Sequence, residues 1–439
     1  MSARLPAAPP VKGEAMEKIL ADVDRVIMPG MAHWNHPRFF AYFTSSGSGP
    51  GILGELLSAA FNVNSMLWQS CPAATELEQV TLDWLRQMIG LPPEFFGIIY
   101  DGGSSSTFHA IAAAREEIAG LNVREHGLND APRLRIYTSE QGHSSIDKAA
   151  LALGLGLNSV RRVEVDDEYR MIPRALANAI DGDRREGFLP FCVVATVGST
   201  SCTSIDPVAA IADICEREGL WLHIDAAHGG AAAVVPEMRH VLDGCERADS
   251  IVVNPHKWLF VQMGLSVLFT RKPGVLRRAF SLVPEYLKTA QGDDAVNFMD
   301  YGIPLGRNFR ALKLWFTLRY FGVEGVAARI REHLRLAREF ANQIDEHPDF
   351  ERLAPVPLST VCFRAHPRGI DDEEALDVLN RKLLEAVNQT GEAFLSHTRL
   401  RGRFTIRLVI SHLRTDEEQI NRVWEIAGER LQSFMRGAV

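Results

Sequence analysis

The stretch SIVVNPHKWLF, residues 250–260, places a lysine directly behind a short apolar strand. Three β-branched residues, 251–253, favour a buried strand, and Lys257 follows between Asn254 and three large apolar residues. An ammonium group removed from water has a lowered pKa, and its neutral form is a nucleophilic amine. The alternative is a lysine whose aliphatic stem packs at the strand end while its charge stays in water. The rest of the chain decides between the two.

The strand at 250–254 is one of seven apolar runs that alternate with helical segments. The other six are expected at 96–100, 133–138, 159–165, 191–197, 220–225 and 265–270. Runs that are apolar on both faces and alternate with helices indicate an α/β fold, with a mainly parallel seven-stranded sheet and helices on both faces. In such sheets the ligand binds beyond the carboxyl ends of the strands. Polar residues at those ends are therefore candidates for the functional site.

The chain divides into three regions by pattern. Residues 1–75 are expected to form a lead-in segment that includes the aromatic run HPRFFAYF, and residues 76–300 the large α/β domain. After residue 300 the sequence becomes helix-rich, with strand candidates at STVCFRA and RFTIRLVIS. We therefore predict a smaller α+β domain at residues 301–439.

Composition excludes several classes of protein. The chain has 439 residues, 46% hydrophobic and 23% charged, and a formal net charge of −8 without a basic cluster, which argues against nucleic acid or anionic membranes as partners. No run of about 18 apolar residues and no signal-peptide core occurs. The six cysteines lack the spacing of a zinc site or a disulfide framework. A small-molecule substrate and a cytoplasmic location are expected.

Polar groups follow several of the expected strands. DGGSSSTFHA is a glycine-rich turn that opens a helix at about Ser104, and free N–H groups there suit a phosphate. Asp225 ends one strand, Ser199 and Thr200 follow another, and His143 follows a third. Taken singly, the aspartate could be a helix cap and the histidine a solvated loop residue. Together with the lysine, however, they match pyridoxal phosphate, which needs an amine for its aldehyde, a carboxylate for its ring nitrogen and a cradle for its phosphate.

Several motifs then resemble one known family. NPHKW, HIDAAHGG, QGHSS, CPAATELE, HPRFFAYF and IPLGRNFRALKLWF occur in the order found in the group II pyridoxal-phosphate-dependent decarboxylases. The resemblance extends from about residue 16 over nearly the whole chain and is strongest to the aromatic-L-amino-acid decarboxylase branch. It implies the fold type I, transferase-like architecture and an enzyme that decarboxylates L-aromatic amino acids to amines. It also implies a homodimer with sites at the subunit interface.

The resemblance implies a role for each matching residue. Lys257 would form the Schiff base with the cofactor, and Asp225 would keep the pyridine nitrogen protonated. His143 would stack on the cofactor ring and touch the substrate. The remaining cofactor contacts would come from Gly103, Ser104, Thr200, Asn254 and His256.

The substrate pocket is expected in the lead-in segment. Trp34, Tyr42 and Phe43 match aromatic pocket positions of the branch, and Ser45 keeps the hydroxyl of a substrate-contacting threonine. Met66 stands where an aromatic residue from the neighbouring subunit often occurs, and a methionine can adapt to several rings. The alternative is that these aromatics only pack the core or a dimer interface.

One departure from the family concerns the reaction. In DDAVNFMDYGIPLG, Phe298 occupies the position of a tyrosine on a mobile loop that is taken to return a proton to the α-carbon in the partner's site. Phenylalanine has no proton to give. Either His143 or a water supplies the proton and an amine forms, or dioxygen intervenes and the products are an aldehyde, ammonia and hydrogen peroxide. Tyr301 is a substitute donor if the loop register differs.

Two other interpretations are weaker. A metal enzyme using His223, His228 and His256 is opposed by their poor ligand spacing. A catalytically silent scaffold is suggested by an amino-terminal region that is shorter than usual for the family. The presence of Lys257, Asp225 and His143 argues against that scaffold.

Overall fold

The computed structural model describes residues 4–129, 131–282 and 295–436. Its larger sheet has seven strands in the order β1-β7-β6-β5-β4-β2-β3. The strands are β1 (Phe96–Tyr100), β2 (Arg133–Ser139), β3 (Val160–Val163), β4 (Phe188–Thr196), β5 (Trp221–Asp225), β6 (Ser250–Val253) and β7 (Ser266–Thr270). All seven strand predictions are confirmed, with bounds shifted by no more than a few residues. The sheet is mainly parallel because only β7 runs antiparallel to its neighbours β6 and β1.

Side chains that alternate along each strand build two apolar cores, one on each face of the sheet. Val193 and Ala195 of β4 join one core, while Cys192 and Val194 point into the other. The first core is covered by α3 (Pro72–Met88), α7 (Pro173–Arg185), α8 (Val208–Glu218) and part of α11 (Ala311–Glu346). The second is covered by α4 (Gly103–Glu116), α6 (Ser145–Ala152) and α10 (Pro273–Phe280). Helices on both faces, as predicted, leave the strand ends as the place for a ligand.

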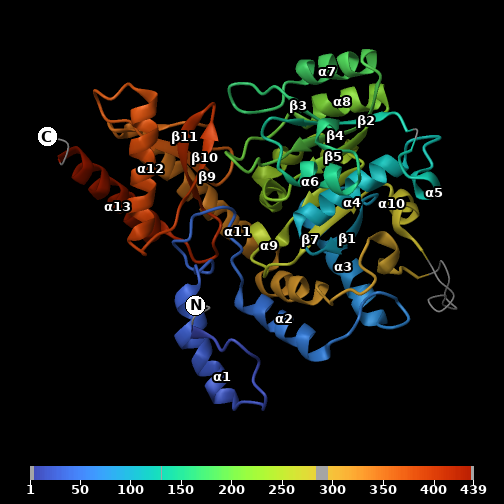
Figure 1. Cartoon of the computed structure of the whole chain (residues 1–439), viewed down its shortest axis with the longest axis horizontal. Helices are drawn as coiled ribbons and strands as arrows, with labels where there is room; N and C mark the ends of the chain where they lie inside the picture. The colour runs from blue at the N-terminus through green and yellow to red at the C-terminus, as the bar shows by residue number, and fades with distance from the viewer. Residues whose placement is uncertain (1–3, 130, 283–294, 437–439) are drawn as a thin grey trace.

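A second sheet lies toward the carboxyl end of the chain, on the left in Figure 1. Its four antiparallel strands, in the order β10-β11-β9-β8, are β8 (Phe350–Arg352), β9 (Thr360–Ala365), β10 (Ser396–Leu400) and β11 (Arg403–Val409). The helices α12 (Glu373–Gln389) and α13 (Glu417–Arg436) pack on it. β9 and β11 match the two predicted strands, whereas the short β8 and the polar β10 lacked a clear apolar pattern.

The long helix α11 connects the two sheets. Its first part, up to Leu334, packs in the core of the larger sheet, and its second part, from Leu336, packs in the core of the smaller one. A glycine, Gly322, kinks it with φ of 62°, a left-handed conformation that favours glycine. The predicted boundary between residues 300 and 301 thus lies just before a helix that contributes to both cores. The division of the chain into three regions stays a prediction.

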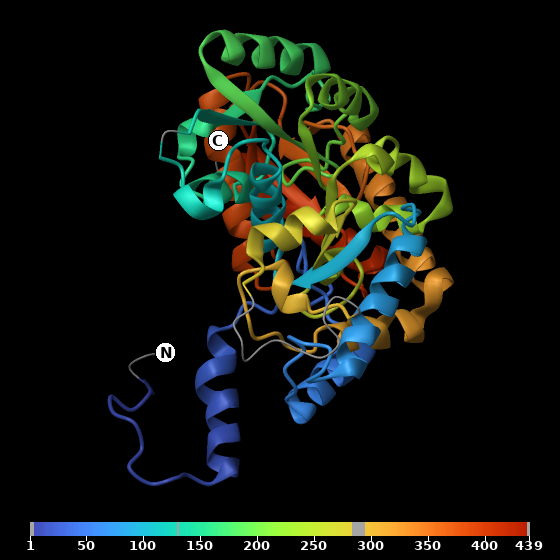
Figure 2. The same ribbon diagram turned by 90° about the vertical axis from the view of Figure 1, so that its right-hand side faces the viewer.

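The amino-terminal region carries two further helices, α1 (Met16–Asp22) and α2 (Gly49–Phe61). Helix α1 has no buried residue and projects away from the body of the molecule (Figure 2). Helix α2 packs on α11 so closely that a Cβ added to Gly54 would lie 2.7 Å from the Cα of Lys313. Within the described residues, no helix is both long and apolar enough to cross a membrane.

Candidate active site

A cavity of about 180 Å³ lies at the carboxyl ends of β4, β5 and β6. It gathers nine of the predicted site residues: Phe43, Gly103, Ser104, His143, Thr200, Asp225, Asn254, His256 and Lys257. Apart from Phe43, which precedes the first strand, they lie at or after the ends of different strands, because parallel strands bring their carboxyl ends to one edge of a sheet. Ser145, Thr196, Gly198, Ala227 and His228 complete the lining.

Lys257 lies in the single-turn helix α9 (Pro255–Trp258), which follows β6. Burial lowers the pKa of its ammonium group, and the nearby negative charge of Asp225 opposes this shift only in part. The Nζ atom lies 5.0 Å from the centre of the Phe43 ring. The lysine therefore faces the cavity with a weakened proton affinity, as a nucleophilic amine requires.

Asp225 ends β5 and is 8% exposed. Its Oδ1 atom accepts a hydrogen bond of 3.1 Å from the backbone N–H of Ala227, which fixes the carboxylate at the cavity wall. A buried carboxylate held this way suits a cationic ring nitrogen.

The start of α4 forms a cradle together with Asn254 and His256. A Cβ added to Gly103 would lie 2.7 Å from Nδ2 of Asn254, so only glycine leaves this space open. The hydroxyl of Ser266 donates to Oδ1 of Asn254 at 2.6 Å, which turns the amide N–H₂ toward the cradle. The backbone N–H of Leu265 donates to Nδ1 of His256 at 3.2 Å, so the neutral ring carries its proton on Nε2. These donors and the helix N-terminus fit a phosphate.

His143 stands at the mouth of the cavity. Its Nδ1 atom accepts a hydrogen bond of 3.1 Å from the backbone N–H of Ser145, which leaves the proton of the neutral ring on Nε2. Surrounding protein atoms displace water and lower the pKa of the ring, although its outer edge is exposed. Thr200 is exposed at the same mouth.

The other predicted site residues do not line this cavity. Trp34 and Tyr42 are 37% and 50% exposed and stack on each other with ring centres 5.4 Å apart. Ser45 is half-buried in the same segment. Met66 packs against Leu67 and Met299 and accepts a backbone hydrogen bond from Met299. Of the expected aromatic wall, only Phe43 reaches the cavity within the described residues.

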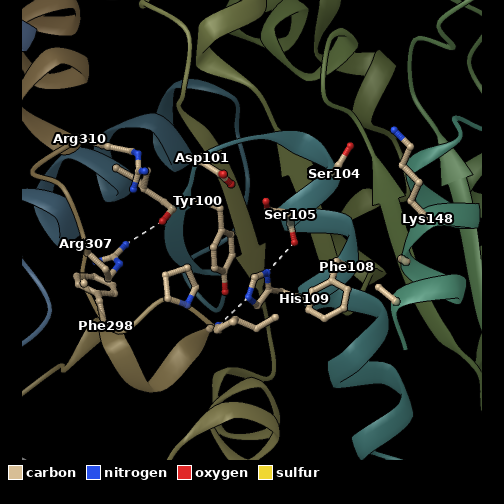
Figure 3. A pocket seen from close by; sticks show the side chains of 17 residues that line it. Tyr100, Asp101, Ser104, Ser105, Phe108, His109, Lys148, Phe298, Arg307 and Arg310 are labelled. Atoms are coloured by element: carbon tan, nitrogen blue, oxygen red, sulfur yellow. Dashed lines mark hydrogen bonds between the residues drawn. The ribbon is translucent and has the colours of Figure 1, made fainter. Parts of the chain in front are cut away.

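Phe298 lies in a neighbouring pocket, shown in Figure 3. It begins the short helix η10 (Phe298–Tyr301) and is 2% exposed, with the Arg307 guanidinium 4.5 Å from its ring centre. Ser104 lines both this pocket and the lysine cavity. The beginning of the loop quoted above, residues 293 and 294, lies outside the described residues. In this chain Phe298 thus does not face Lys257.

Arg407 of β11, a charged residue close to Phe43 at the cavity wall, was not predicted from the sequence. It is 3% exposed, and its Nε and Nη1 donate to the backbone carbonyl of Ser201 and the hydroxyl of Ser396. Its Nη2 has no hydrogen-bond partner among the described residues. None of their carboxylates forms an ion pair with the Arg407 guanidinium. The guanidinium carbon lies 5.6 Å from the centre of the Phe43 ring. The available signal was an arginine in the middle of the strand candidate RFTIRLVIS.

The three histidines of the metal alternative make different contacts. Nδ1 of His223 shares a hydrogen bond of 2.9 Å with Ser250, and Nδ1 of His256 is bonded as described above. His228 stacks between Phe43 and Trp258. No group of three or more metal-ligating side chains gathers in the described ranges.

The fold is that of an α/β enzyme class that binds pyridoxal phosphate, and the cavity offers an amine, a carboxylate and a glycine-rich cradle that fit this cofactor. Comparison with known proteins agrees: the model of the pyridoxal-dependent decarboxylase conserved domain matches residues 1–366. The chain belongs to the pyridoxal-dependent decarboxylase family.

Relatives in this family include enzymes with two kinds of product. Tyrosine decarboxylase 4 of Petroselinum crispum is 39% identical over 98% of this chain and 87% of its own length. Phenylacetaldehyde synthase of Arabidopsis thaliana is 38% identical over 97% of this chain and 88% of its own. A crystal structure of Oryza sativa TDC with PLP and tryptamine superimposes with a TM-score of 0.95 and 34% identity, covering 99% of this chain and 91% of that one.

Proposed function

We propose that this enzyme decarboxylates L-aromatic amino acids, with tryptophan, dopa, tyrosine or phenylalanine as substrate, and releases the amine and carbon dioxide. The observation that carries the proposal is the cavity in which a lysine of lowered pKa faces Asp225, His143 and a phosphate cradle. Tyrosine decarboxylase 4 and the TDC structure with tryptamine support an aromatic substrate.

When bound, pyridoxal phosphate supplies an aldehyde that condenses with an amine and a protonated ring that accepts the electrons released by decarboxylation. We assign the amine that holds the aldehyde to Lys257 and the carboxylate beside the ring nitrogen to Asp225. Gly103, Ser104, Asn254 and His256 hold the phosphate, and Thr200 lies beside the cofactor. His143 covers the ring face at the cavity mouth, where it contacts the substrate.

Arg407 is the residue that binds the α-carboxylate of the substrate in this proposal. Its guanidinium is buried, and among the described residues Nη2 has no hydrogen-bond partner and no carboxylate pairs with the group. A bound anion would therefore accept the unused hydrogen bond and neutralise the charge. Phe43 lies close to both this cation and the Lys257 amine and contributes an apolar wall. Holding the carboxylate at a fixed place selects which bond at the α-carbon breaks.

A second candidate function is that of an aromatic aldehyde synthase, which the phenylalanine at position 298 favours. Without a hydroxyl there, the α-carbon is not reprotonated from this position. Dioxygen can then take up the electron pair to become hydrogen peroxide, and water releases the aldehyde and ammonia. The phenylacetaldehyde synthase among the relatives supports this candidate. Because Phe298 does not line its own chain's cavity, it would act in the site of a partner subunit, as would Met66, while Trp34, Tyr42 and Ser45 extend the substrate pocket.

The test is an assay of the purified enzyme with tryptophan, dopa, tyrosine and phenylalanine, in which amine and peroxide are both quantified. Amine in equal amount to carbon dioxide is the expected result, and abundant peroxide with little amine would favour the aldehyde synthase. Phe298→Tyr should then shift the product toward amine. An unchanged product ratio in that variant would mean that position 298 does not contact the reacting carbon.

We also propose a cytoplasmic homodimer with its sites at the subunit interface. Helix α2 exposes a row of large apolar side chains: Ile52, Leu53, Leu56, Leu57 and Phe61. Helix α1 projects from the body of the molecule (Figure 1). Its residues Met16, Ile19 and Leu20 are exposed. Clusters of large apolar side chains on a protein surface normally mark protein interfaces. All six cysteines are free thiols, which is consistent with a reducing compartment.

A further inference from the structure

His228 is a buried histidine whose hydrogen-bonding capacity is unused. Its side chain is 1% exposed, and neither Nδ1 nor Nε2 has a hydrogen-bond partner among the described residues. The ring nevertheless lines the same cavity as Lys257, Asp225 and His143. Buried polar atoms are almost always paired, so an unpaired ring at a cavity wall points to a ligand.

The ring cannot turn away to find another partner. It is stacked between Phe43, with ring centres 3.9 Å apart, and Trp258, with ring centres 4.7 Å apart and planes at 7°. Trp258 is held in turn because its Nε1 donates to Nδ1 of His333 at 2.9 Å. The faces of the imidazole are therefore covered, and the ring can form hydrogen bonds only along the edge that carries both nitrogens.

The surroundings of His228 favour an anionic ligand. Burial and the positive charges of Lys257 and Arg407 hold the pKa of the ring well below its usual range, so it is neutral and offers one donor and one acceptor. Lys257, Arg407 and His228 all lie against the Phe43 ring. The buried cation of Arg407, which has no carboxylate partner among the described residues, and the neutral donor of His228 form a site to which an anion is attracted.

We propose that His228 is a substrate-binding residue whose ring edge donates a hydrogen bond to the α-carboxylate of the amino acid, beside Arg407. The inference rests on the proposed function, because it assigns the cavity between Phe43 and Lys257 to an amino acid. A neutral donor holds the carboxylate in place without adding, to the charge of Arg407, a further positive charge that would stabilise it against loss of carbon dioxide.

The test compares two ligands that differ in the carboxylate. Competitive inhibition constants of the holoenzyme are measured for 3-phenylpropanoate, which has the carboxylate but no amine, and for 2-phenylethylamine, which has the amine but no carboxylate. The indole pair, 3-(indol-3-yl)propanoate and tryptamine, is measured in parallel. His228→Phe keeps the aromatic stack and removes both ring nitrogens. It should raise the inhibition constants of the carboxylates about tenfold or more and change those of the amines less than about twofold.

Two further variants make the result specific. His228→Gln restores a donor and should bring carboxylate binding back to within about threefold of the unsubstituted enzyme. His333→Phe changes a buried histidine of the same stack that does not line the cavity, and it should alter thermal stability but not the ratio between the two ligands. Cofactor absorbance of each holoenzyme verifies that the site is assembled.

If His228→Phe weakens the binding of carboxylates and amines equally, or leaves carboxylate binding unchanged, His228 does not bind the carboxylate. The proposed function would remain intact. Failure of the unsubstituted holoenzyme to bind either pair would overturn both.

Discussion

At the scale of single residues, the site depends on groups whose charge is controlled by burial. Lys257 has a lowered pKa because it is desolvated, and Asp225 compensates only in part. His256 is neutral near pH 7 because burial, and then the charge of Lys257, lower its pKa to about 4. A neutral donor in the cradle and a weakly basic lysine keep the cavity receptive to a phosphate and an aldehyde.

Removing the charge of Arg407 should weaken binding of the amino acid. Arg407→Met keeps much of the side-chain volume and removes the buried charge, so KM for the amino acid should rise about 30-fold or more through the lost contact with the carboxylate. The melting temperature should not fall, because a buried cation without a carboxylate partner is costly to the folded state. Steady-state kinetics and calorimetry measure the two effects. An unchanged KM would remove Arg407 from the site.

At the scale of elements, a buried ion pair joins α3, β1 and the segment before α11. Glu78 of α3 pairs with Arg307 at 2.7 Å, and the two are 2% and 8% exposed. The same carboxylate accepts the backbone N–H of Ile99, and Arg307 donates to the carbonyl of Ile99. Because the guanidinium also covers the Phe298 ring, this pair fixes the residue that distinguishes the two candidate functions.

Breaking this pair should be destabilising. Glu78→Gln leaves the Arg307 charge buried without its counter-charge, so the free energy of unfolding should fall by about 3 kcal/mol. Urea denaturation followed by circular dichroism measures the change. Glu339→Gln, which removes one of the exposed partners of Arg335 on α11, is the control and should have almost no effect. Similar losses in both variants would contradict a special role for the buried pair.

At the scale of the whole molecule, the exposed face of α2 predicts association. Introducing charge with Ile52→Glu and Leu56→Glu, at side chains 51% and 63% exposed, should shift the protein from dimer to monomer in light scattering. Val378→Glu places the same charge at a residue of α12 that is 47% exposed and should leave the dimer intact. If the double variant remains a dimer in light scattering, the exposed face of α2 is not the dimer interface.

Buried histidines also make the whole fold sensitive to acid. Burial lowers the pKa of His109, His223 and His412 to about 4 and that of His333 to about 3. Since the unfolded chain protonates its histidines near pH 6.5, it binds more protons, and stability is lost as the pH falls from about 6.5 to 4. Each histidine should account for about 2 kcal/mol between pH 7 and pH 5.

Urea denaturation of the apoprotein at the two pH values measures this loss. Asp206 acts in the opposite direction, because burial raises its pKa to about 6. His333→Phe should reduce the difference between pH 7 and pH 5 by about 2 kcal/mol, whatever its effect at pH 7. A difference that is the same in this variant would mean that His333 is protonated in the folded chain.

The amino-acid sequence by itself determined the large sheet and much of the cavity. Its strands were predictable because buried parallel strands are apolar on both faces, and residues such as Asp225 and His143 follow them directly in the chain. Their roles stay predictions until the variants are made. Only the tertiary structure brought Arg407 of the second sheet to Phe43 and closed Phe43 and Trp258 over His228. Such contacts join residues far apart in the chain, and no local periodicity encodes them.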